Sequence, residues 1–358
     1  MTKEPRKSRP PTKAKPSASP HEPEALEAAS GVLLQSAPGL AKLLQKELIY
    51  AGAMKKDQKV FVKLQRNHDL VFLNQVKEGL DFEKVRIAEV ILRCPAYGRF
   101  KISKRQLELI ADELKELGPR RLVISVAGKH FKRQDLVRFF WREMEERGYD
   151  FNDDLEPEVW IFCVDENWYF GVPLIKSRDT EGRFDREEER EGALPPTIAA
   201  ALAFAAHPRE NDVVLDPVCG SGTLLSEFHR FAPTAKLIGR DIDPQAISIA
   251  KRNLKSVAGV DLKAGDSREL DLSVKPNLIL ANLPFGVQFG SKETNLDLYK
   301  AILKSVNETA AESWRGVFLT SDTKNFEAAV DAMKFYGEVL FKVKVRGELA
   351  TAYRVKAK

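Results

Sequence analysis

Apolar residues recur every three or four positions in the first half of the chain, which predicts helices. One helix is expected after Ser36, ending at Gly52, with an apolar face of leucines: Leu40, Leu43, Leu44 and Leu48. A second helix is expected within residues 103–119, and its apolar face is Leu107, Ile110, Leu114 and Leu117. Gly118 and Pro119 should end it. A third helix is predicted at residues 133–148.

Short apolar runs between these helices predict strands. They are expected at residues 59–64, 69–74, 85–94 and 120–131, and residues 158–174 predict a strand hairpin. No internal repeat stands out in this half. Because strands and helices are mixed here, we expect small α+β units.

The pattern changes after a charged, turn-rich segment, where we expect a linker at residues 177–192. A helix follows at residues 196–206, and short apolar strands then alternate with helices. The strands are expected at residues 212–218, 236–243, 260–266, 277–284 and 316–322. This alternation predicts an α/β fold with a parallel, doubly wound sheet. Residues 338–347 and 351–357 lie too close for a crossover helix and should form an antiparallel hairpin at its edge.

The composition is that of an ordinary soluble globular protein, with 43% hydrophobic and 30% charged residues among 358. The sequence has no run of about 18 apolar residues, as a membrane-spanning helix needs, and no apolar core of a secretory signal. Cys94, Cys163 and Cys219 are scattered, with neither metal-ligand nor disulfide spacing. We therefore expect a cytoplasmic protein without a bound metal ion.

The net charge of +5 is unevenly distributed along the chain. Residues 1–20 carry six Lys or Arg and one Glu, and the Lys-, Pro- and Ser-rich residues 1–28 are predicted to be a disordered basic tail. Residues 91–140 sum to +7 and residues 141–170 to −8. This separation suggests a cationic face that binds a polyanion. A solvated surface with chance clustering is the alternative.

The stretch LDPVCGSGTLLSE, residues 215–227, predicts a strand, a glycine turn and the start of a helix. Gly220 and Gly222 allow unusual dihedrals and a close approach to a ligand. The free N–H groups of the helix start suit a carboxylate or a phosphate. Cys219 and Thr223, which flank these glycines, are expected at the same cofactor site.

Acidic side chains stand at three successive strand ends. Asp241 could accept both ribose hydroxyls of a nucleoside cofactor, with Asp243 beside it, and Asp266 could accept from an adenine amine. A dinucleotide-binding turn, as in a dehydrogenase, would carry a third glycine where this chain has Leu225, and it would not need Asp216. S-adenosylmethionine fits better, since it offers an ammonium group and has no pyrophosphate.

The stretch ANLPFG ends the fourth strand of this half, at the edge where open α/β sheets bind ligands. The side-chain oxygen of Asn282 and a backbone carbonyl freed by Pro284 could accept both N–H bonds of a base amine and localise its lone pair. Phe285 could stack on the base. We predict that Asn282, Leu283, Pro284 and Phe285 form the catalytic site, with Asn282 also contacting the cofactor. A tight turn with an inward Phe is the alternative.

This half resembles the amino-methyltransferases with an N/D-P-P-Y/F motif. Leu283 replaces the usual first proline, a position that varies in guanine-N2 methyltransferases. The segment GALPPTIAAAL also resembles the one before the cofactor site in these enzymes, which implies that Pro196 and Thr197 lie near the methionine end of the cofactor. The resemblance implies a Rossmann-like class I methyltransferase domain at residues 193–358.

The amino-terminal half is similar to a THUMP domain, expected at residues 85–176, preceded by a ferredoxin-like domain at residues 29–84. The stretches that carry this similarity are LVISVAGKHFKRQDLVRFF and VWIFCVDENWYFGVPL. THUMP domains bind RNA, and in tRNA enzymes they hold the acceptor end. The resemblance implies phosphate contacts from six basic residues: Lys129, Lys132, Arg133 and, as weaker candidates, Arg99, Lys101 and Arg121. His130 and Phe131 are expected to pack instead.

Together these motifs resemble the TrmN-like tRNA (guanine-N2-)-methyltransferases. The resemblance implies that the enzyme uses S-adenosylmethionine to form N2-methylguanosine in tRNA, at an acceptor-stem guanine, position 6. Four alternatives remain open: guanine-N2 methylation of large-subunit rRNA, methylation of adenine N6 or cytosine N4, a non-catalytic RNA-binding protein with a relic fold and, ranked last, a dehydrogenase. The protein is expected to be monomeric.

Overall fold

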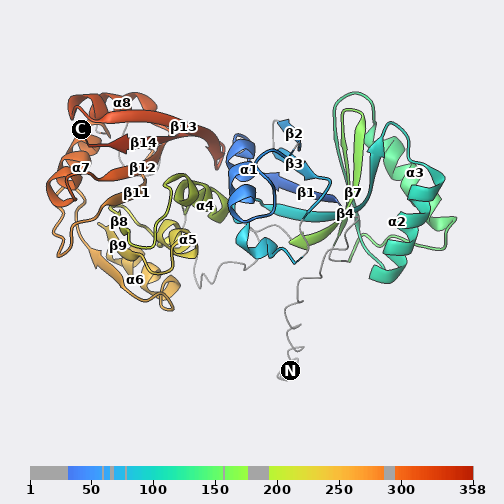
Figure 1. Cartoon of the computed structure of the whole chain (residues 1–358), viewed down its shortest axis with the longest axis horizontal. Helices are drawn as coiled ribbons and strands as arrows, with labels where there is room; N and C mark the ends of the chain where they lie inside the picture. Colours follow the sequence, from blue (N-terminus) through green and yellow to red (C-terminus); the bar gives the residue numbers. More distant parts are fainter. Residues whose placement is uncertain are drawn as a thin grey trace, which may run out of the picture.

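Two seven-stranded sheets form two units that lie side by side along the longest axis of the molecule (Figure 1). The computed structural model describes seven ranges of the chain: residues 31–58, 60–64, 68–76, 79–155, 158–175, 193–285 and 295–357. The predicted tail at residues 1–28 and the predicted linker at residues 177–192 lie outside the described residues.

The amino-terminal sheet has the strand order β2-β3-β1-β4-β7-β6-β5. Its strands are β1 (Gly31–Ser36), β2 (Phe61–Leu64), β3 (Asp69–Leu73), β4 (Val90–Arg99), β5 (Leu122–Ala127), β6 (Val159–Val164) and β7 (Asn167–Ile175). All neighbours pair antiparallel except β5 and β6, which are parallel. Because β1 pairs with β4, the sheet continues across the domain boundary expected between residues 84 and 85, and that division stays a prediction.

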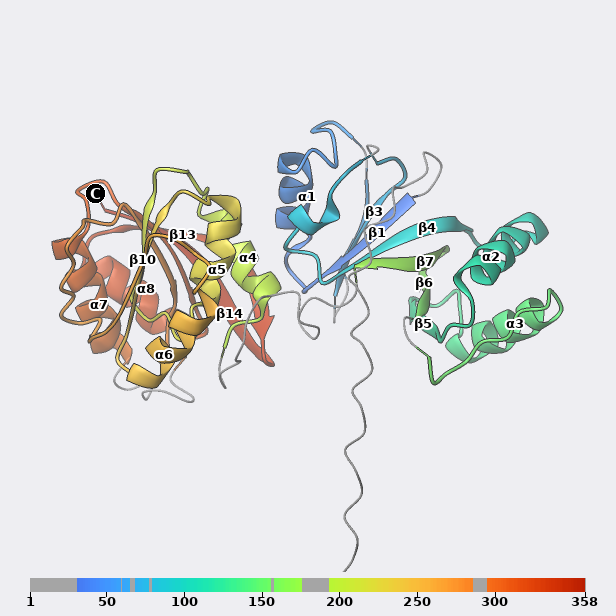
Figure 2. The same ribbon diagram turned by 90° about the horizontal axis from the view of Figure 1, so that it is seen from below.

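The helices of this unit are α1 (Ala41–Tyr50), α2 (Lys104–Leu117) and α3 (Arg133–Glu145), with a short 3-10 helix η1 (Phe82–Lys84). The predicted apolar stripes are buried in α1 and α2, although Leu43 and Leu117 are only partly covered. Gly118 ends α2 with a φ of +74°, as expected. Figure 2 shows α2 and α3 together at the end of the unit that lies away from the second sheet.

Two assignments in this unit differ from the prediction. The strand expected at residues 85–94 begins only at Val90, because Val85, Ile87 and Ala88 are buried in an apolar core outside the sheet. The sequence analysis also assigned no element to residues 31–36, which form the central strand β1. This strand is buried on both faces, so it lacks the polar–apolar alternation by which strands are recognised.

The carboxyl-terminal sheet has the order β10-β9-β8-β11-β12-β14-β13. Its strands are β8 (Val213–Asp216), β9 (Lys236–Asp241), β10 (Val260–Ala264), β11 (Leu278–Asn282), β12 (Arg315–Thr320), β13 (Tyr336–Val345) and β14 (Glu348–Lys356). The first five are parallel, and β14 runs antiparallel to both β12 and β13. The predicted parallel sheet with an antiparallel edge hairpin is confirmed.

Helices cover both faces of this sheet: α4 (Pro196–Ala205), α5 (Thr223–Phe231), α6 (Pro244–Asn253), α7 (Asn295–Thr309) and α8 (Thr323–Ala332). Alternate residues of the central strands are apolar on both faces of the sheet, so both faces need helices to cover them. Leu280 belongs to the core beneath α4, α5 and α6, whereas Ile279 and Ala281 belong to the core beneath α7 and α8. Within the described ranges, every helix is too short or too polar to cross a lipid bilayer.

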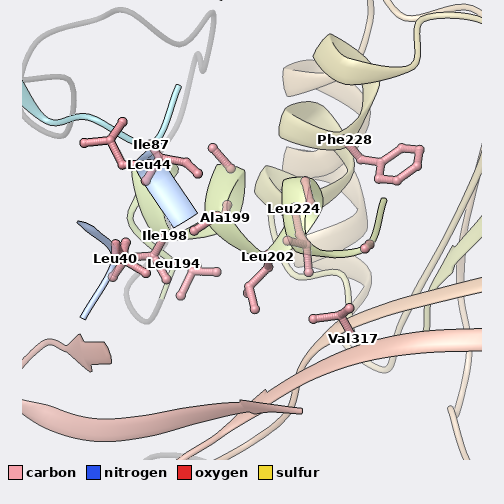
Figure 3. Close-up of a cluster of buried hydrophobic side chains, with 14 of the residues drawn as sticks. Leu40, Leu44, Ile87, Leu194, Ile198, Ala199, Leu202, Leu224, Phe228 and Val317 are labelled. Atoms are coloured by element: carbon pink, nitrogen blue, oxygen red, sulfur yellow. The ribbon is translucent and has the colours of Figure 1, made fainter. Parts of the chain in front are cut away.

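One apolar core is continuous between the two units. Leu40, Leu44 and Ile87 of the amino-terminal unit lie beside Leu194 and Ile198 of the carboxyl-terminal unit (Figure 3). Helix α1 packs against α4, so the two sheets are joined by a packed interface as well as by the chain.

Candidate active site

A pocket of about 560 Å³ opens at the carboxyl edge of the second sheet. Four strand ends contribute to its wall: residues within 216–224, 241–243, 266–268 and 282–285. The tip of the β13–β14 hairpin, the residues before α4, and Leu298 and Ile302 of α7 complete the wall. Open α/β sheets bind ligands at this edge.

The predicted glycine turn connects β8 to α5. Gly220 and Gly222 adopt left-handed φ angles of +52° and +81°, and α5 begins directly afterwards at Thr223. The Gly220 N–H donates to Asp241 Oδ2 at 2.8 Å, which ties the turn to the next strand. A Cβ atom at Gly222 would lie 2.9 Å from Leu254 Cδ1. Both positions therefore favour glycine for their backbone angles, and Gly222 also for its close packing against Leu254.

Asp216 ends β8 and lines the pocket while being only 2% exposed. Its Oδ1 accepts the Val218 N–H at 3.1 Å. Burial raises the pKa of this carboxyl well above its usual range, and the nearby Asp241 raises it further. A bound ammonium would favour the ionised form, so Asp216 fits a cationic ligand group. Cys219 also lines the pocket, and burial raises the pKa of its thiol, which makes it an unreactive wall residue.

Asp241 is held rigidly at the pocket wall. Its two oxygens accept the N–H groups of Gly220, at 2.8 Å, and Asp243, at 3.0 Å. A carboxylate has further lone pairs, so these bonds leave acceptor capacity for ribose hydroxyls. Asp243 also lines the pocket, but its Oδ1 accepts the Gln245 N–H at 2.8 Å and caps α6. Ile242, which the sequence analysis missed, is 70% exposed and offers the pocket an apolar surface.

Asp266 lies at the third strand end, where it was expected. Its carboxylate accepts from Arg268 Nε at 2.9 Å to each oxygen. The bond from Arg268 holds the pKa of Asp266 below its usual range. Because Arg268 engages both oxygens, the contact with an adenine amine stays a prediction. Within the described ranges, no three His, Cys, Asp or Glu side chains gather as metal ligands.

All four residues of the predicted catalytic motif line the pocket. The Oδ1 atom of Asn282 is buried and has no hydrogen-bond partner among the described residues. An unsatisfied buried acceptor costs about 1–3 kcal/mol, so an N–H donor on a ligand is its natural partner. Leu283 is 2% exposed and donates its N–H to the Leu319 carbonyl at 2.9 Å. Phe285 is half-buried against the apolar core, which leaves part of its ring available to a base.

Tyr299 on α7 holds this motif from behind. Its hydroxyl contacts the Pro284 carbonyl at 2.5 Å and Thr320 Oγ1 at 3.0 Å, and its side chain is fully buried. The Pro284 carbonyl is therefore engaged within the protein, which leaves the Leu283 carbonyl as the candidate backbone acceptor. The sequence analysis missed Tyr299, because a tyrosine on the apolar face of a helix is no different in pattern from a core residue.

The residues before α4 contribute to the pocket, and the predicted cofactor contacts of Pro196 and Thr197 stay predictions. Pro196 and Thr197 were expected near the cofactor, but neither lines the pocket. Pro196 is the first residue of α4, and Thr197 is fully buried in the helix packing. Ala193 and Leu194 line the pocket in their place.

Three of the predicted RNA-binding lysines, Lys101, Lys129 and Lys132, are exposed on loops that follow β4 and β5. The rings of Phe100 and His130 are 6.3 Å apart, which places these loops beside each other. His130 is thus exposed rather than packed in the core, whereas Phe131 packs against the core as expected.

The three predicted arginines are engaged with the protein. Arg99 Nε donates to Glu166 at 2.8 Å, and Arg133 Nε donates to the Ile124 carbonyl at 3.1 Å. Arg121 lies before β5, 3.8 Å from Glu158, at the opposite end of the strand from Lys129. A six-residue strand spans about 20 Å, so Arg121 and the lysines cannot contact one phosphate. RNA contacts by all six basic residues stay predictions.

Comparison with known proteins agrees with this geometry. Residues 183–351 match the UPF0020 family, described as an RMKL-like methyltransferase domain. A tRNA (guanine(6)-N2)-methyltransferase of Thermus thermophilus is 28% identical over 61% of this chain and 67% of its own length. The crystal structure of TrmN from Thermus thermophilus has the same fold, with a TM-score of 0.74 at 21% identity, covering 92% of this chain and 100% of that one. The chain is therefore similar to the TrmN-like methyltransferases, and the family model covers just under half of it.

The match to other curated relatives is shorter. The Bos taurus protein named tRNA (guanine(6)-N(2))-methyltransferase THUMP3 is 28% identical over 39% of this chain. The match spans only about a third, 31%, of that relative. The predicted fold class, a Rossmann-like methyltransferase sheet with an α+β amino-terminal arm, is confirmed.

Proposed function

We propose that this TrmN-like protein is an S-adenosylmethionine-dependent enzyme that methylates the exocyclic N2 amine of a guanine in tRNA. The observation that carries the proposal is the buried Asn282 Oδ1 at the end of β11, which has no partner among the described residues and lies beside a pocket with acidic residues at neighbouring strand ends. An acceptor in this position fits an amine donor and does not fit a hydride-transfer site.

The pocket residues fit the cofactor group by group. Asp216 suits the ammonium, the Gly220–Gly222 turn and the α5 amino end suit the carboxylate, and Asp241 suits the ribose. Ile242 offers an apolar surface to the adenine ring. When bound, S-adenosylmethionine supplies an electrophilic methyl group on its sulfonium.

The chain's own residues would prepare the amine. Asn282 Oδ1 and the Leu283 carbonyl accept its two N–H bonds, which turns the nitrogen lone pair away from the base ring. Tyr299 fixes the turn that carries both acceptors. Phe285 presents the exposed part of its ring to the base. No general base with a shifted pKa is needed, because the methylated amine loses its proton readily.

The proposed RNA is tRNA, and the proposed nucleotide is the acceptor-stem guanine at position 6. Relatives with this activity in their names support the choice. We assign RNA binding to the THUMP-like unit at residues 85–176, with Lys101, Lys129 and Lys132 as its exposed cationic side chains. A paired guanine must leave the stack, which costs a few kcal/mol that RNA contacts would offset. A monomeric state and a cytoplasmic location are further proposals.

Methyl transfer from labelled S-adenosylmethionine to separate pools of unmodified tRNA and rRNA tests this function. Digestion should yield N2-methylguanosine from tRNA, and mapping should place it at position 6. Asn282→Ala should abolish transfer, whereas Asn282→Asp keeps an acceptor oxygen and should keep measurable activity. Label in rRNA alone would move the substrate to the ribosome. Methylated adenine or cytosine would refute the assignment of the base, and cofactor binding without transfer would favour a relic fold.

A further inference from the structure

Charged side chains are buried inside the apolar interface between the two units. Arg86, in the segment before β4, donates Nε and Nη2 to the Glu227 carboxylate at 3.2 and 3.0 Å. The side chains are 5% and 1% exposed. Glu227 lies on α5, so this bidentate ion pair connects the amino-terminal arm to the methyltransferase domain.

A second acidic side chain holds the backbone that carries Arg86. Glu47 on α1 is fully buried and accepts the N–H groups of Arg86, at 2.8 Å, and Ile87, at 3.0 Å. Helix α1, the segment at residues 86–87 and helix α5 are therefore linked by successive directional bonds. Apolar residues surround them, including Leu44, which lies beside Ile87 in Figure 3.

Helix α5 reaches the candidate active site at its other end. It begins immediately after Gly222, and its residues Thr223 and Leu224 line the pocket. Glu227 lies one turn further along the same helix. The arm is thus fastened to the element whose amino end forms the cofactor turn.

Stability alone does not explain a buried ion pair. Apolar residues of similar volume often serve folding as well or better, because burying two charges is costly. A bidentate Arg–carboxylate pair does require one geometry, whereas an apolar contact tolerates sliding. This geometry favours a role for the ion pair in orienting one unit relative to the other.

We propose that Arg86 and Glu227 are positioning residues that fix the angle between the amino-terminal arm and the methyltransferase domain, and thereby determine which nucleotide of a bound RNA reaches the pocket. The proposal rests on the proposed function, since it assigns the choice of nucleotide to this interface. The apolar contact keeps the units together, and the ion pair selects one arrangement of them.

The angle can be measured without any RNA. Leu109 on α2 and Val274 in the methyltransferase domain are 47% and 42% exposed, and the three native cysteines are buried. Spin labels at Leu109→Cys and Val274→Cys should give one narrow distance distribution in the full-length protein. The double variant Arg86→Met/Glu227→Leu should broaden it at least twofold while the melting temperature and S-adenosylmethionine affinity stay unchanged.

A matched control removes a similar pair inside the arm. Arg93 on β4 pairs with Glu113 on α2, with Nη1 3.1 Å from Oε2, and both side chains are 15% exposed. Arg93→Met/Glu113→Leu makes the same substitutions without touching the interface. This variant should keep the narrow distribution.

Mapping of methylated nucleotides then tests specificity. Wild type and control should label one guanine, whereas Arg86→Met/Glu227→Leu should label additional nucleotides or lose about tenfold in kcat/KM for tRNA. An unchanged distance distribution together with unchanged site selection would overturn the proposal. If the wild type methylates no RNA, the proposed function fails, and the distance measurement still decides whether the pair fixes the angle.

Discussion

At the scale of single residues, the side chains of the candidate site differ in whether their polar atoms have hydrogen-bond partners. Asn282 Oδ1 is buried without a partner among the described residues, whereas the Tyr299 hydroxyl behind it has two. Unsatisfied groups are costly and persist where a ligand completes them. Satisfied groups behind them keep the unsatisfied ones in place. Asn282 is therefore assigned to substrate contact and Tyr299 to positioning.

Tyr299→Phe should lower kcat about fivefold to tenfold and leave KM for tRNA nearly unchanged. The variant keeps the ring but loses the bonds to Pro284 and Thr320, so the turn is held less firmly. Steady-state kinetics measures the effects on kcat and KM separately. Tyr353→Phe is the control, because it removes a hydroxyl bonded to Glu327 in the same core, away from the pocket. Equal losses in both variants would show a general effect on folding.

Glu47 should make stability fall as pH rises. Burial raises its pKa to about 8 from an ordinary value of 4.5, despite the opposing backbone bonds and Arg86. Between these values the unfolded carboxyl is ionised and the folded one is protonated, so the folded state binds the extra proton. Its contribution to the free energy of unfolding should drop by at most about 1.4 kcal/mol per pH unit.

Urea unfolding of wild type and Glu47→Gln at pH 5, 6, 7 and 8 isolates this contribution. Asp216 shifts stability in the same direction, and the half-buried His68 and His229 shift it in the opposite one, so only the difference between the two proteins is informative. For Glu47→Gln, the free energy of unfolding should fall less steeply with pH than for the wild type. Parallel curves would mean that Glu47 is ionised in the folded protein.

At the scale of elements, the glycine turn and α5 act as one unit. Gly222→Ala should destabilise the protein by about 1–2 kcal/mol, because its left-handed backbone disfavours a Cβ atom. It should also weaken S-adenosylmethionine binding, because an alanine strained at this φ would shift the turn, while its methyl group would displace the end of the Leu254 side chain. Calorimetric titration gives the affinity. Gly259→Ala is the control, because Gly259 also has a left-handed φ of +75° but no neighbour near an added Cβ atom. It should lower stability and leave the S-adenosylmethionine affinity unchanged.

The elements also show what sequence can predict. The turn at Gly220 and the ANLPFG stretch lie at the ends of β8 and β11, as the predicted alternation of strands and helices indicated. Residues 85–88 were misassigned because apolar residues that bury against another unit have the same composition as a strand. Pro196 and Thr197 were placed by resemblance, and both are buried in α4 without lining the pocket. The positioning role of Tyr299 is visible only from its bond to Pro284, 15 positions earlier in the chain, and no local sequence pattern indicates such a bond.

At the scale of the whole molecule, charge on the arm should govern RNA affinity. Lys129→Ala/Lys132→Ala should weaken tRNA binding and reduce the slope of log K against log salt by about 1 for each phosphate that is no longer neutralised. Fluorescence anisotropy at several salt concentrations measures this slope. Lys251→Ala, on α6 of the methyltransferase domain, should leave it unchanged. A weaker affinity with an unchanged slope would point to altered folding of the loops.

The apolar core shared by the two units has a consequence for how the protein unfolds. Leu40, Leu44 and Ile87 cover Leu194 and Ile198, so neither unit has a complete hydrophobic core without the other. Scanning calorimetry should therefore show a single heat-absorption peak for the intact chain, and two separate peaks would contradict this. A fragment that starts at residue 193 would expose the apolar side of α4 to water and should aggregate. A change of side-chain volume on one side of this shared surface should therefore need a compensating change on the other.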